Sequence, residues 1–339
     1  MSAGKLSLAM IGVGNWGKNV LRNMASLSKV ELKAICDPSP ENLKRASAQY
    51  PGVATASDPT AILADPSIEA VAIATPAVTH HAVAKQALLA GKHVFVEKPM
   101  AMSAEEGRDL QSAAEKSGKV LMVGHLLEYH PAVDKLKSLV DTGELGAIRY
   151  LYSQRVNLGV VRTDENAWWS LAPHDISIAL YLIGREPKTV SARGASFLNP
   201  KIEDVVFANL MFEGGITAQI HVSWLDPHKI RKFTIVGARK MVTFDDGDST
   251  EKVRIYDKGA DVGLSYETYG EAITLRSGDI VIPRIESVEP LKVECGHFVE
   301  CALNNRTPRS DAKDGLRVVR VLEAGQRSIE KQGAPVELA

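Results

Sequence analysis

Six residues near the start of the chain have the spacing of a turn that can hold a diphosphate. Gly12-Val13-Gly14-Asn15-Trp16-Gly17 reads G-x-G-x-x-G, and it joins an apolar run over 6–13 to a helical pattern over 15–27. In such a turn Gly12 permits the tight bend, Gly14 lets a pyrophosphate approach the backbone, and Gly17 lets helix and strand pack closely. The start of the helix adds N–H groups and a partial positive charge for the anion. The turn is therefore predicted to bind a dinucleotide.

An acidic residue stands where the ribose of such a dinucleotide would lie. Asp37 follows Gly17 at a spacing of about 20 residues and comes directly after the apolar run over 30–36. A carboxylate here accepts hydrogen bonds from ribose hydroxyls and repels a 2′-phosphate, so it favours NAD over NADP. Two alternatives stay open. The glycine turn could bind no dinucleotide, or the chain could prefer NADP, with Ser39 beside the phosphate.

Two later strand patterns end in residues suited to the nicotinamide half of the cofactor. Thr75-Pro76 closes the run over 70–75, and Glu97-Lys98-Pro99 closes the run over 93–97. Ligands of open α/β sheets bind beyond the carboxyl ends of the strands. We therefore expect these residues around the nicotinamide, although Lys98 could also be an ordinary surface lysine.

Two histidines complete the expected cofactor site. His80 lies downstream of Thr75-Pro76, and His125 directly follows the strand pattern over 120–124. For His125 a place in the wall of the site and a structural role are equally open. The residues expected to bind the cofactor are Gly12, Gly14, Asn15, Trp16, Gly17, Asp37, Thr75, Pro76, His80, Glu97, Lys98 and His125.

The order of the elements predicts an α/β fold in two domains. Apolar runs alternate with helical patterns up to residue 124, which implies a parallel sheet with helices on both faces. Strand patterns dominate from 190 to 256, where short turns favour antiparallel pairing, and two helices close the chain. We expect a Rossmann NAD-binding domain over 1–124. Residues 125–339 are expected to form an α+β domain with a largely antiparallel open sheet for substrate binding and oligomerisation.

The composition excludes several classes of protein. The chain has 339 residues, of which 45% are hydrophobic and 24% charged, and 40 Lys+Arg against 41 Asp+Glu give a net charge of −1. A nucleic-acid binder usually shows a basic balance or stripe, and no apolar run approaches the roughly 20 residues of a membrane span. The three cysteines have neither metal-ligand nor disulfide spacing. We expect no metal site, no nucleic-acid or membrane partner, and a cytoplasmic location.

The motifs together resemble the glucose–fructose oxidoreductase, inositol dehydrogenase and MocA family (Gfo/Idh/MocA). The resemblance covers nearly the whole chain, and its most specific mark is Glu97-Lys98-Pro99 at a strand end. Tyr129-His130-Pro131 fits the segment that crosses between the domains. The stretch Leu171–Ile176 is most similar to members that oxidise the 3-hydroxyl of a UDP-linked N-acetylated amino sugar. The resemblance implies an NAD(P)-dependent oxidoreductase that acts on CH–OH groups.

The resemblance also implies the catalytic residues. The segment Ser170–Ile176 fits the family's catalytic segment and places His174 at the start of a helix over 175–183. A base with a pKa near the working pH suits the removal of a hydroxyl proton. We expect His174 to take this proton and Lys98 to stabilise the developing alkoxide. The reverse assignment, with a desolvated Lys98 as the base, stays open.

The substrate is expected against the segment over 155–169. Asn157 and Arg162 could bind sugar hydroxyls, a carboxylate or a diphosphate, and Trp169 offers an aromatic face, unless Trp168-Trp169 belongs to a core or a subunit contact. Many relatives carry an acid where this chain has Ser170, and the candidates to replace it are Asp164, Glu165 and Asp175. The predicted substrate-binding residues are Asn157, Arg162, Trp169, Ser170 and His174.

The leading hypothesis is oxidation of a ring hydroxyl by NAD. The favoured substrate is a nucleotide-linked N-acetylated amino sugar or its uronate, oxidised at C3. The resulting 3-keto sugar would serve surface-polysaccharide biosynthesis. A dehydrogenase of free sugars or cyclitols is the alternative, and a non-catalytic NAD-binding regulator is a third reading. The resemblance implies association through the open sheet face, as a homodimer or homotetramer.

Overall fold

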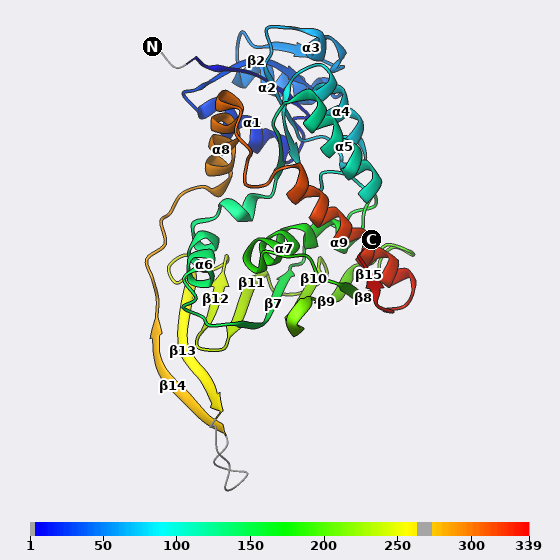
Figure 1. Ribbon diagram of the computed structural model, residues 1–339. Coiled ribbons are helices and arrows are strands. Elements are labelled where there is room, and N and C mark those ends of the chain that lie inside the picture. The colour runs from blue at the N-terminus through cyan, green and yellow to red at the C-terminus, as the bar shows by residue number, and fades with distance from the viewer. Residues whose placement is uncertain (1–3, 263–272, 339) are drawn as a thin grey trace. The chain divides into compact units, whose positions relative to one another are not determined.

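The computed structural model describes residues 4–262 and 273–338, which form two compact units (Figure 1). The first unit comprises Met1–Tyr129 and Val288–Arg320, and the second comprises His130–Ser287 and Val321–Ala339. The sequence pattern alone places residues 288–320 in the second domain. They pack with the first unit instead, because α8 (Pro290–Asn304) buries Cys295 and Phe298 in one core with residues of β1 and β5.

A six-stranded parallel sheet forms the centre of the first unit. The strand order is β3-β2-β1-β4-β5-β6, and each neighbouring pair is parallel. The strands are β1 (Leu6–Ile11), β2 (Val30–Cys36), β3 (Ala54–Ala56), β4 (Ala70–Ile73), β5 (His93–Glu97) and β6 (Leu121–Gly124). The order reverses between β1 and β4, so the crevice beyond their carboxyl ends is where such a sheet binds ligands.

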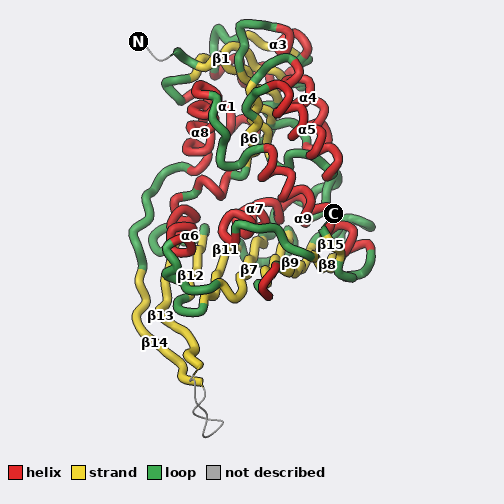
Figure 2. Tube along the Cα trace, in the orientation of Figure 1, coloured by secondary structure: helices red, strands yellow, loops and turns green. Residues whose placement is uncertain are grey.

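Helices cover both faces of this sheet, which confirms the predicted Rossmann architecture (Figure 2). On one face α4 (His80–Leu89) and α5 (Ala104–Ser117) bury Leu88 and Leu110. On the other face α1 (Gly17–Ser26) and α8 bury apolar side chains against the alternate residues of the strands. The remaining helices are α2 (Pro40–Gln49), α3 (Thr60–Ala64), η1 (Ala77–Thr79) and η2 (Leu126–Tyr129).

The second unit contains a nine-stranded sheet of order β14-β13-β12-β11-β7-β10-β9-β8-β15. Only the β7–β10 pair is parallel among the strands that the structure describes, so the sheet is largely antiparallel, as expected. The strands are β7 (Ile148–Val156), β8 (Thr189–Ala195), β9 (Val205–Met211), β10 (Thr217–Ser223), β11 (Ile230–Gly237), β12 (Met241–Asp245), β13 (Val253–Val262), β14 (Ile273–Val281) and β15 (Val336–Glu337).

Helices α6 (Pro131–Asp141) and α7 (Ala167–Ile183) pack on one face of this sheet, and η3 (Glu213–Gly215) joins β9 to β10. α9 (Ala312–Glu330) has residues in both units. The predicted helix start at 175 is wrong: α7 begins eight residues earlier, because the Asn166 side chain caps it by accepting from the N–H of Trp169. Pro173 lies inside the helix rather than before it, so His174 is a mid-helix residue.

Within the described residues, no helix is long and apolar enough to cross a membrane.

Candidate functional site

The turn after β1 is tightly packed at two of its three glycines and open at the third. Gly12 has a φ of +86°, and a Cβ on it would meet the backbone of Ala74 and Thr75 at 2.8 Å. A Cβ on Gly17 would lie 2.1 Å from the carbonyl oxygen of Gly12. A Cβ on Gly14, by contrast, would meet nothing within 4 Å. Gly12 and Gly17 are thus required by the fold itself, whereas the open space at Gly14 fits a bound anion beside the start of α1.

Asp37 lies at the end of β2 and is already held by the turn. Its Oδ2 accepts from the backbone N–H of Val13 at 2.8 Å. Its Oδ1 accepts from the N–H of Ser39 at 2.9 Å and from the Asn42 side chain at 3.0 Å. A carboxylate has about four acceptor sites, so room remains for a ribose hydroxyl. The Asp37 carboxylate therefore both fixes the turn and fits the predicted ribose contact.

Glu97 connects the glycine turn to the end of β5. Its Oε1 accepts from the indole N–H of Trp16 at 2.6 Å, and its Oε2 accepts from the backbone N–H of Lys98 at 3.3 Å. Burial raises the pKa of Glu97, and the Trp16 hydrogen bond and the charge of Lys98 oppose this rise. A Cβ on Gly124 would come within 3.2 Å of the carboxyl group, so a larger residue at the end of β6 would crowd Glu97. Glu97 thus supports both the turn and the strand end that bears Lys98.

Thr75 and Pro76 follow the end of β4, and His80 is the first residue of α4. The His80 ring is buried, and its nitrogens lie 2.8 Å from the carbonyl oxygen of Pro99 and 2.9 Å from that of Thr75. Burial lowers the pKa of His80. Both ring nitrogens already contact backbone carbonyls of the protein. His80 would therefore affect a bound cofactor indirectly, by holding Thr75 and the loop after Lys98 in place. Its link between β4 and β5 is the kind of contact that sequence alone does not reveal.

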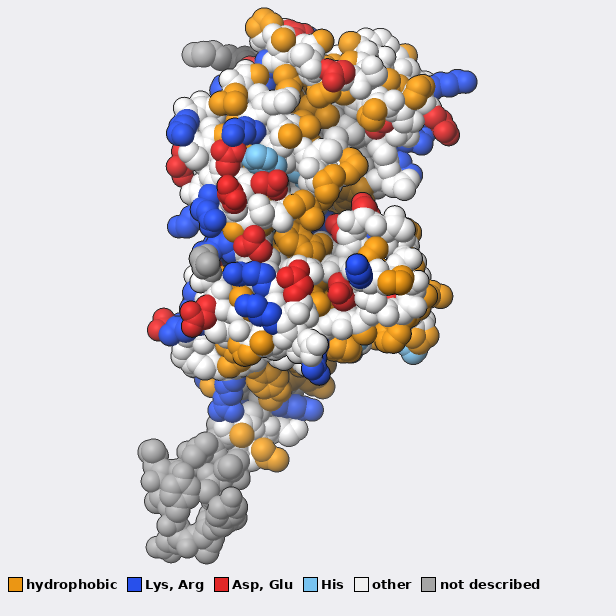
Figure 3. Space-filling model, turned by 90° about the vertical axis from the view of Figure 1, so that its right-hand side faces the viewer, with side chains coloured by type: hydrophobic (Ala, Val, Ile, Leu, Met, Phe, Trp, Pro, Cys, Tyr) orange, Lys and Arg blue, Asp and Glu red, His pale blue; other side chains and the backbone are white. Residues whose placement is uncertain are grey.

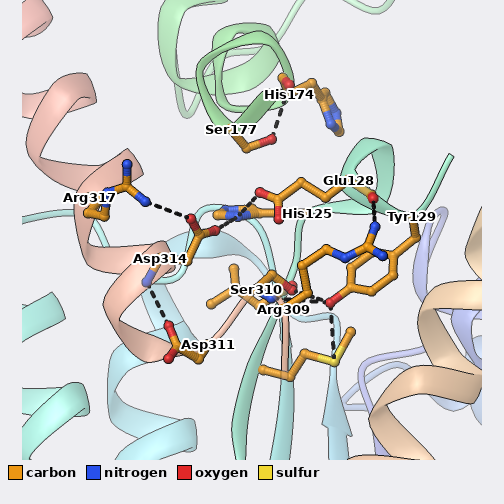
Figure 4. A network of polar contacts seen from close by, with 12 residues as sticks. His125, Glu128, Tyr129, His174, Ser177, Arg309, Ser310, Asp311, Asp314 and Arg317 are labelled. Atoms are coloured by element: carbon orange, nitrogen blue, oxygen red, sulfur yellow. Dashed lines mark hydrogen bonds and ion pairs between the residues drawn. The ribbon is translucent and has the colours of Figure 1, made fainter. Parts of the chain in front are cut away.

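His125 forms a buried ion pair rather than an open wall (Figure 4). Its Nδ1 lies 2.8 Å from Asp314 Oδ2 and 3.4 Å from Glu128 Oε1. Burial alone would lower the pKa of His125, but the hydrogen bonds of the two carboxylates outweigh burial and raise it to about 10. The ligand atoms of the three residues lie within 4.8 Å of one another, as in a metal site. The 2.8 Å contact, however, has the length of a charge-assisted hydrogen bond.

Two buried glutamates accompany this ion pair and were not expected from the sequence. Burial and the neighbouring Asp314 raise the pKa of Glu128 to about 7. Burial and the neighbouring Glu97 raise the pKa of Glu294 well above its ordinary value. The sequence does contain a signal for Glu294. Its spacing from Leu291 and Phe298 puts it on the apolar face of α8. An acid on the core face of an amphipathic helix is a candidate for a polar role.

In the second unit α7 carries the segment expected to be catalytic. Ser170 and His174 are four residues apart and half-buried, so they lie on the same face of the helix. The hydroxyl of Ser177 donates to the backbone carbonyl of His174 at 3.1 Å. A helix holds an imidazole more rigidly than a loop, which suits a base that must meet one hydroxyl.

Each of the three acids that could replace the residue at Ser170 is paired with an arginine. Asp175 is 2% exposed and binds Arg155 through two contacts of 2.7 and 3.3 Å. Burial raises the pKa of Asp175, and Arg155 opposes this rise. Arg162 lies 3.1 Å from Asp164 and 2.8 Å from Glu165. Of the three acids, Asp175 is the one whose arginine lies on the sheet, because Arg155 belongs to β7 and Asp175 to α7.

The other predicted substrate residues lie around the end of β7. Asn157 follows this strand and is half-buried, and Arg162 lies in the loop that leads to α7. Trp168 belongs to the core, where its indole N–H donates to the carbonyl of Leu322 at 2.8 Å. Trp169 is 7% exposed, so only an edge of its ring is open to a ligand. The structure thus gathers the predicted cofactor residues in the first unit and the predicted substrate residues in the second.

Two family models match the chain. Residues 6–125 match the oxidoreductase family with an NAD-binding Rossmann fold, and residues 133–243 match the Gfo/Idh/MocA C-terminal domain.

Two of the similar proteins are named for a nucleotide sugar and a cyclitol. UDP-N-acetylglucosamine 3-dehydrogenase of Acidithiobacillus ferrooxidans is 30% identical, over 82% of this chain and 85% of its own. The scyllo-inositol 2-dehydrogenase (NAD(+)) of Bacillus subtilis is 26% identical, over 97% of this chain and 95% of its own. The solved structure of UDP-N-acetylglucosamine 3-dehydrogenase GnnA from A. ferrooxidans superposes with a TM-score of 0.80 and 26% identity, covering 96% of this chain and 97% of that one.

The two glycines of the turn should separate cofactor binding from folding. Gly14→Ala should leave the free energy of unfolding within about 0.5 kcal/mol of wild type, because its Cβ meets only open space. It should weaken NAD binding at least about tenfold, or roughly 1.4 kcal/mol, by blocking the pyrophosphate. Gly17→Ala should instead destabilise the fold by about 1–3 kcal/mol.

Calorimetric titration with NAD and denaturant unfolding of both variants measure these effects. An unchanged dissociation constant for Gly14→Ala would show that the cofactor does not approach this backbone.

Proposed function

The chain belongs to the Gfo/Idh/MocA family of NAD-binding oxidoreductases that act on the CH–OH groups of sugars or cyclitols, and we propose that its substrate is a nucleotide-linked sugar. The enzyme would oxidise a ring hydroxyl, at C3, of an N-acetylated amino sugar or its uronate. The product would be a 3-keto sugar for surface-polysaccharide biosynthesis. We place this reaction in the cytoplasm, where nucleotide sugars are made.

The observation that carries the substrate proposal is the 30% identity to a UDP-N-acetylglucosamine 3-dehydrogenase over most of both chains. The segment Leu171–Ile176, which resembles such enzymes, lies on α7 and contains His174. Arg162 and Asn157 near the end of β7 supply hydrogen-bond donors of the kind that a diphosphate or sugar hydroxyls accept. These features support a nucleotide sugar over a smaller alcohol.

NAD supplies the acceptor for the hydride that leaves the substrate carbon. The residues proposed to hold it lie along the carboxyl edge of the first sheet: the turn over Gly12–Gly17, Asp37, and the ends of β4 and β5. Glu97, His80 and His125 are buried, so we assign them to the support of this edge.

His174 and Lys98 are proposed to manage the proton of the substrate hydroxyl. The half-buried imidazole of His174 on α7 is the group proposed to accept this proton, because histidine is a common general base. The ammonium of Lys98, at the end of β5, would stabilise the negative charge that develops on the same oxygen. The exchanged assignment, with Lys98 as base, uses the same two residues.

A dehydrogenase of free sugars or cyclitols is the second candidate. The 26% identity to a scyllo-inositol 2-dehydrogenase extends over 97% of this chain, which is a longer match than that to the nucleotide-sugar enzyme. A cyclitol lacks a diphosphate, so Arg162 could donate only to its hydroxyl groups.

A panel of UDP-sugars, free sugars and cyclitols, scored by NADH absorbance, decides between the candidates. We expect turnover with a UDP-N-acetylated amino sugar or its uronate at a kcat/KM at least about a hundredfold above that of any cyclitol, about 2.7 kcal/mol of selectivity. Turnover with cyclitols alone would establish the second candidate, and NADH binding without turnover of any alcohol would indicate a regulator.

Lys98→Ala and His174→Ala should each lower kcat/KM by more than about a hundredfold, because each removes a group that interacts with the reacting oxygen. Lys116→Ala and His228→Ala are matched controls, since both side chains are exposed in the same respective units. Steady-state kinetics on all four variants is the measurement. Losses below about tenfold for both site variants would remove them from the catalytic site.

We infer that the protein associates through the outer face of the second sheet. Four exposed apolar or aromatic side chains share the face opposite α6 and α7, on two strands that flank β10: Tyr150 and Tyr152 on β7, and Phe207 and Met211 on β9. Hydrophobic side chains are visible along this part of the second unit (Figure 3). Phe207 also stacks on His221, with ring centroids 4.3 Å apart. Such a patch in contact with a second copy would remove apolar surface from water.

Light scattering at micromolar concentration should therefore give the mass of a dimer or a tetramer. The double variant with Tyr152→Lys and Phe207→Lys should be a monomer, because desolvating two ammonium groups outweighs the remaining contacts. Leu89→Lys, on α4 of the first unit, is the control and should leave the mass unchanged, since Leu89 is also exposed. A monomeric wild type, or a double variant of unchanged mass, would contradict this interface.

A further inference from the structure

A buried acid at one edge of the second sheet binds two neighbouring segments of the chain. Asp204 lies directly before β9 with 0% exposure. Its Oδ1 accepts from the indole N–H of Trp224 at 2.6 Å. Its Oδ2 accepts from the backbone N–H groups of Phe197 at 2.6 Å and Leu198 at 2.9 Å. Both oxygens are therefore engaged by N–H donors, in the short contacts that an ionised carboxylate makes.

The register of the sheet explains why one residue reaches both segments. A single row of paired residues crosses β7, β10, β9 and β8, and it consists of Val156, Ser223, Val205 and Ala195. This row is the last residue of β7, β8 and β10 and the first residue of β9. Asp204 directly precedes the row, so it lies at the edge where the chain leaves β8 and β10.

Asp204 supports the turn that carries Asn157 through the end of β10. Its backbone carbonyl accepts from the N–H of Trp224 at 3.2 Å and from the hydroxyl of Ser223 at 3.1 Å. The carbonyl of Ser223 accepts in turn from the N–H of Asn157 at 3.1 Å, and that of Trp224 accepts from the N–H of Gly159 at 3.1 Å. A Cβ on Gly159 would meet the amide nitrogen of Asn157 at 2.4 Å, so the Asn157 side chain lies against this turn.

The residue before Asp204 contacts the start of α7. The carbonyl of Glu203 accepts from the N–H of Ala167 at 2.9 Å, and its Oε2 accepts from the side chain of the helix cap, Asn166, at 2.6 Å. Two adjacent residues therefore contact both segments that carry proposed substrate residues, namely the turn after β7 and the helix that contains His174.

The loop after β8 is held by hydrogen bonds more than by packing. Phe197 is 69% exposed and Leu198 is 49% exposed, so burial of their side chains contributes little to fixing the loop. Burial alone would raise the pKa of Asp204, but the N–H groups of this loop and the indole of Trp224 outweigh burial and lower it. An amide at position 204 would turn an NH2 group toward these donors. An isosteric substitution therefore removes hydrogen bonds without removing volume.

We propose that Asp204 is a positioning residue for the substrate: its carboxylate fixes the loop over 196–199 and, through the end of β10, the turn that presents Asn157. Because Asp204 is fully buried, it acts through these two segments rather than by contact. The proposal rests on the proposed role of Asn157 for its effect on the enzyme. The order that Asp204 gives to the two segments does not depend on any substrate.

Hydrogen exchange tests the positioning without a substrate. The amides of Phe197, Leu198 and Gly159 should exchange at least about tenfold faster in Asp204→Asn than in wild type, because their acceptors are lost or displaced. Asp141→Asn is the matched control, since Asp141 is an exposed acid on α6 of the same unit, and it should leave these amides unchanged. Unchanged exchange at all three amides in Asp204→Asn would overturn the proposal.

Kinetics tests the effect on the substrate. Asp204→Asn should raise KM for the best sugar substrate more than about tenfold, while kcat and KM for NAD stay within about threefold, because the loss falls on substrate binding. Trp224→Phe removes one hydrogen bond of the carboxylate and should give the same split with a smaller rise in KM. That variant also decides the question if Asp204→Asn does not fold.

Val242→Ala is the control for a general loss of stability. Val242 is buried in β12, which β11 and β7 separate from β10, so the substitution weakens the same unit elsewhere. It should leave KM for the sugar unchanged. An unchanged KM in Asp204→Asn and Trp224→Phe, or an equal rise in Val242→Ala, would overturn the positioning role. Inactivity of wild type on every alcohol would instead remove the proposed function and leave the exchange result standing.

Discussion

The backbone at the end of β1 leaves no space for a side chain, and the first unit is arranged around that constraint. Gly17 must be glycine because α1 begins against the carbonyl of Gly12. The turn is then fixed from two sides, by Asp37 through the N–H of Val13 and by Glu97 through the indole of Trp16. The carboxyl ends of β1, β2 and β5 are thereby tied together at the edge where a dinucleotide binds.

This arrangement places several ionisable groups where water does not reach them. His125 and Asp314 neutralise each other as a pair, while the pKa values of Glu97, Glu128 and Glu294 are all raised, chiefly by burial. Buried acids of this kind cost folding free energy unless they are protonated or hydrogen-bonded. Under the proposed mechanism these acids would help to set the charge around the Lys98 amine, because neighbouring charges shift the pKa of an ionisable group.

The sequence was sufficient for those features that follow from local pattern. The glycine spacing, the apolar runs and the acid after β2 predict the Rossmann sheet, which is confirmed. The predicted start of α7 is wrong. Proline usually occurs in the first turn of a helix, whereas Pro173 lies inside α7 and the Asn166 cap lies upstream of it. The place of α8 in the first unit depends on contacts between residues far apart in the chain, such as Phe95 with Phe298. Such contacts have no local signature, and neither does the pairing of His125 with Asp314.

In the proposed mechanism Lys98 and His174 act on one hydroxyl next to the cofactor. A crystal structure of the protein with NAD and its best substrate measures this most directly. The account predicts Lys98 Nζ and a ring nitrogen of His174 both within about 3 Å of the same substrate oxygen. A complex in which either side chain points away from that oxygen would contradict it.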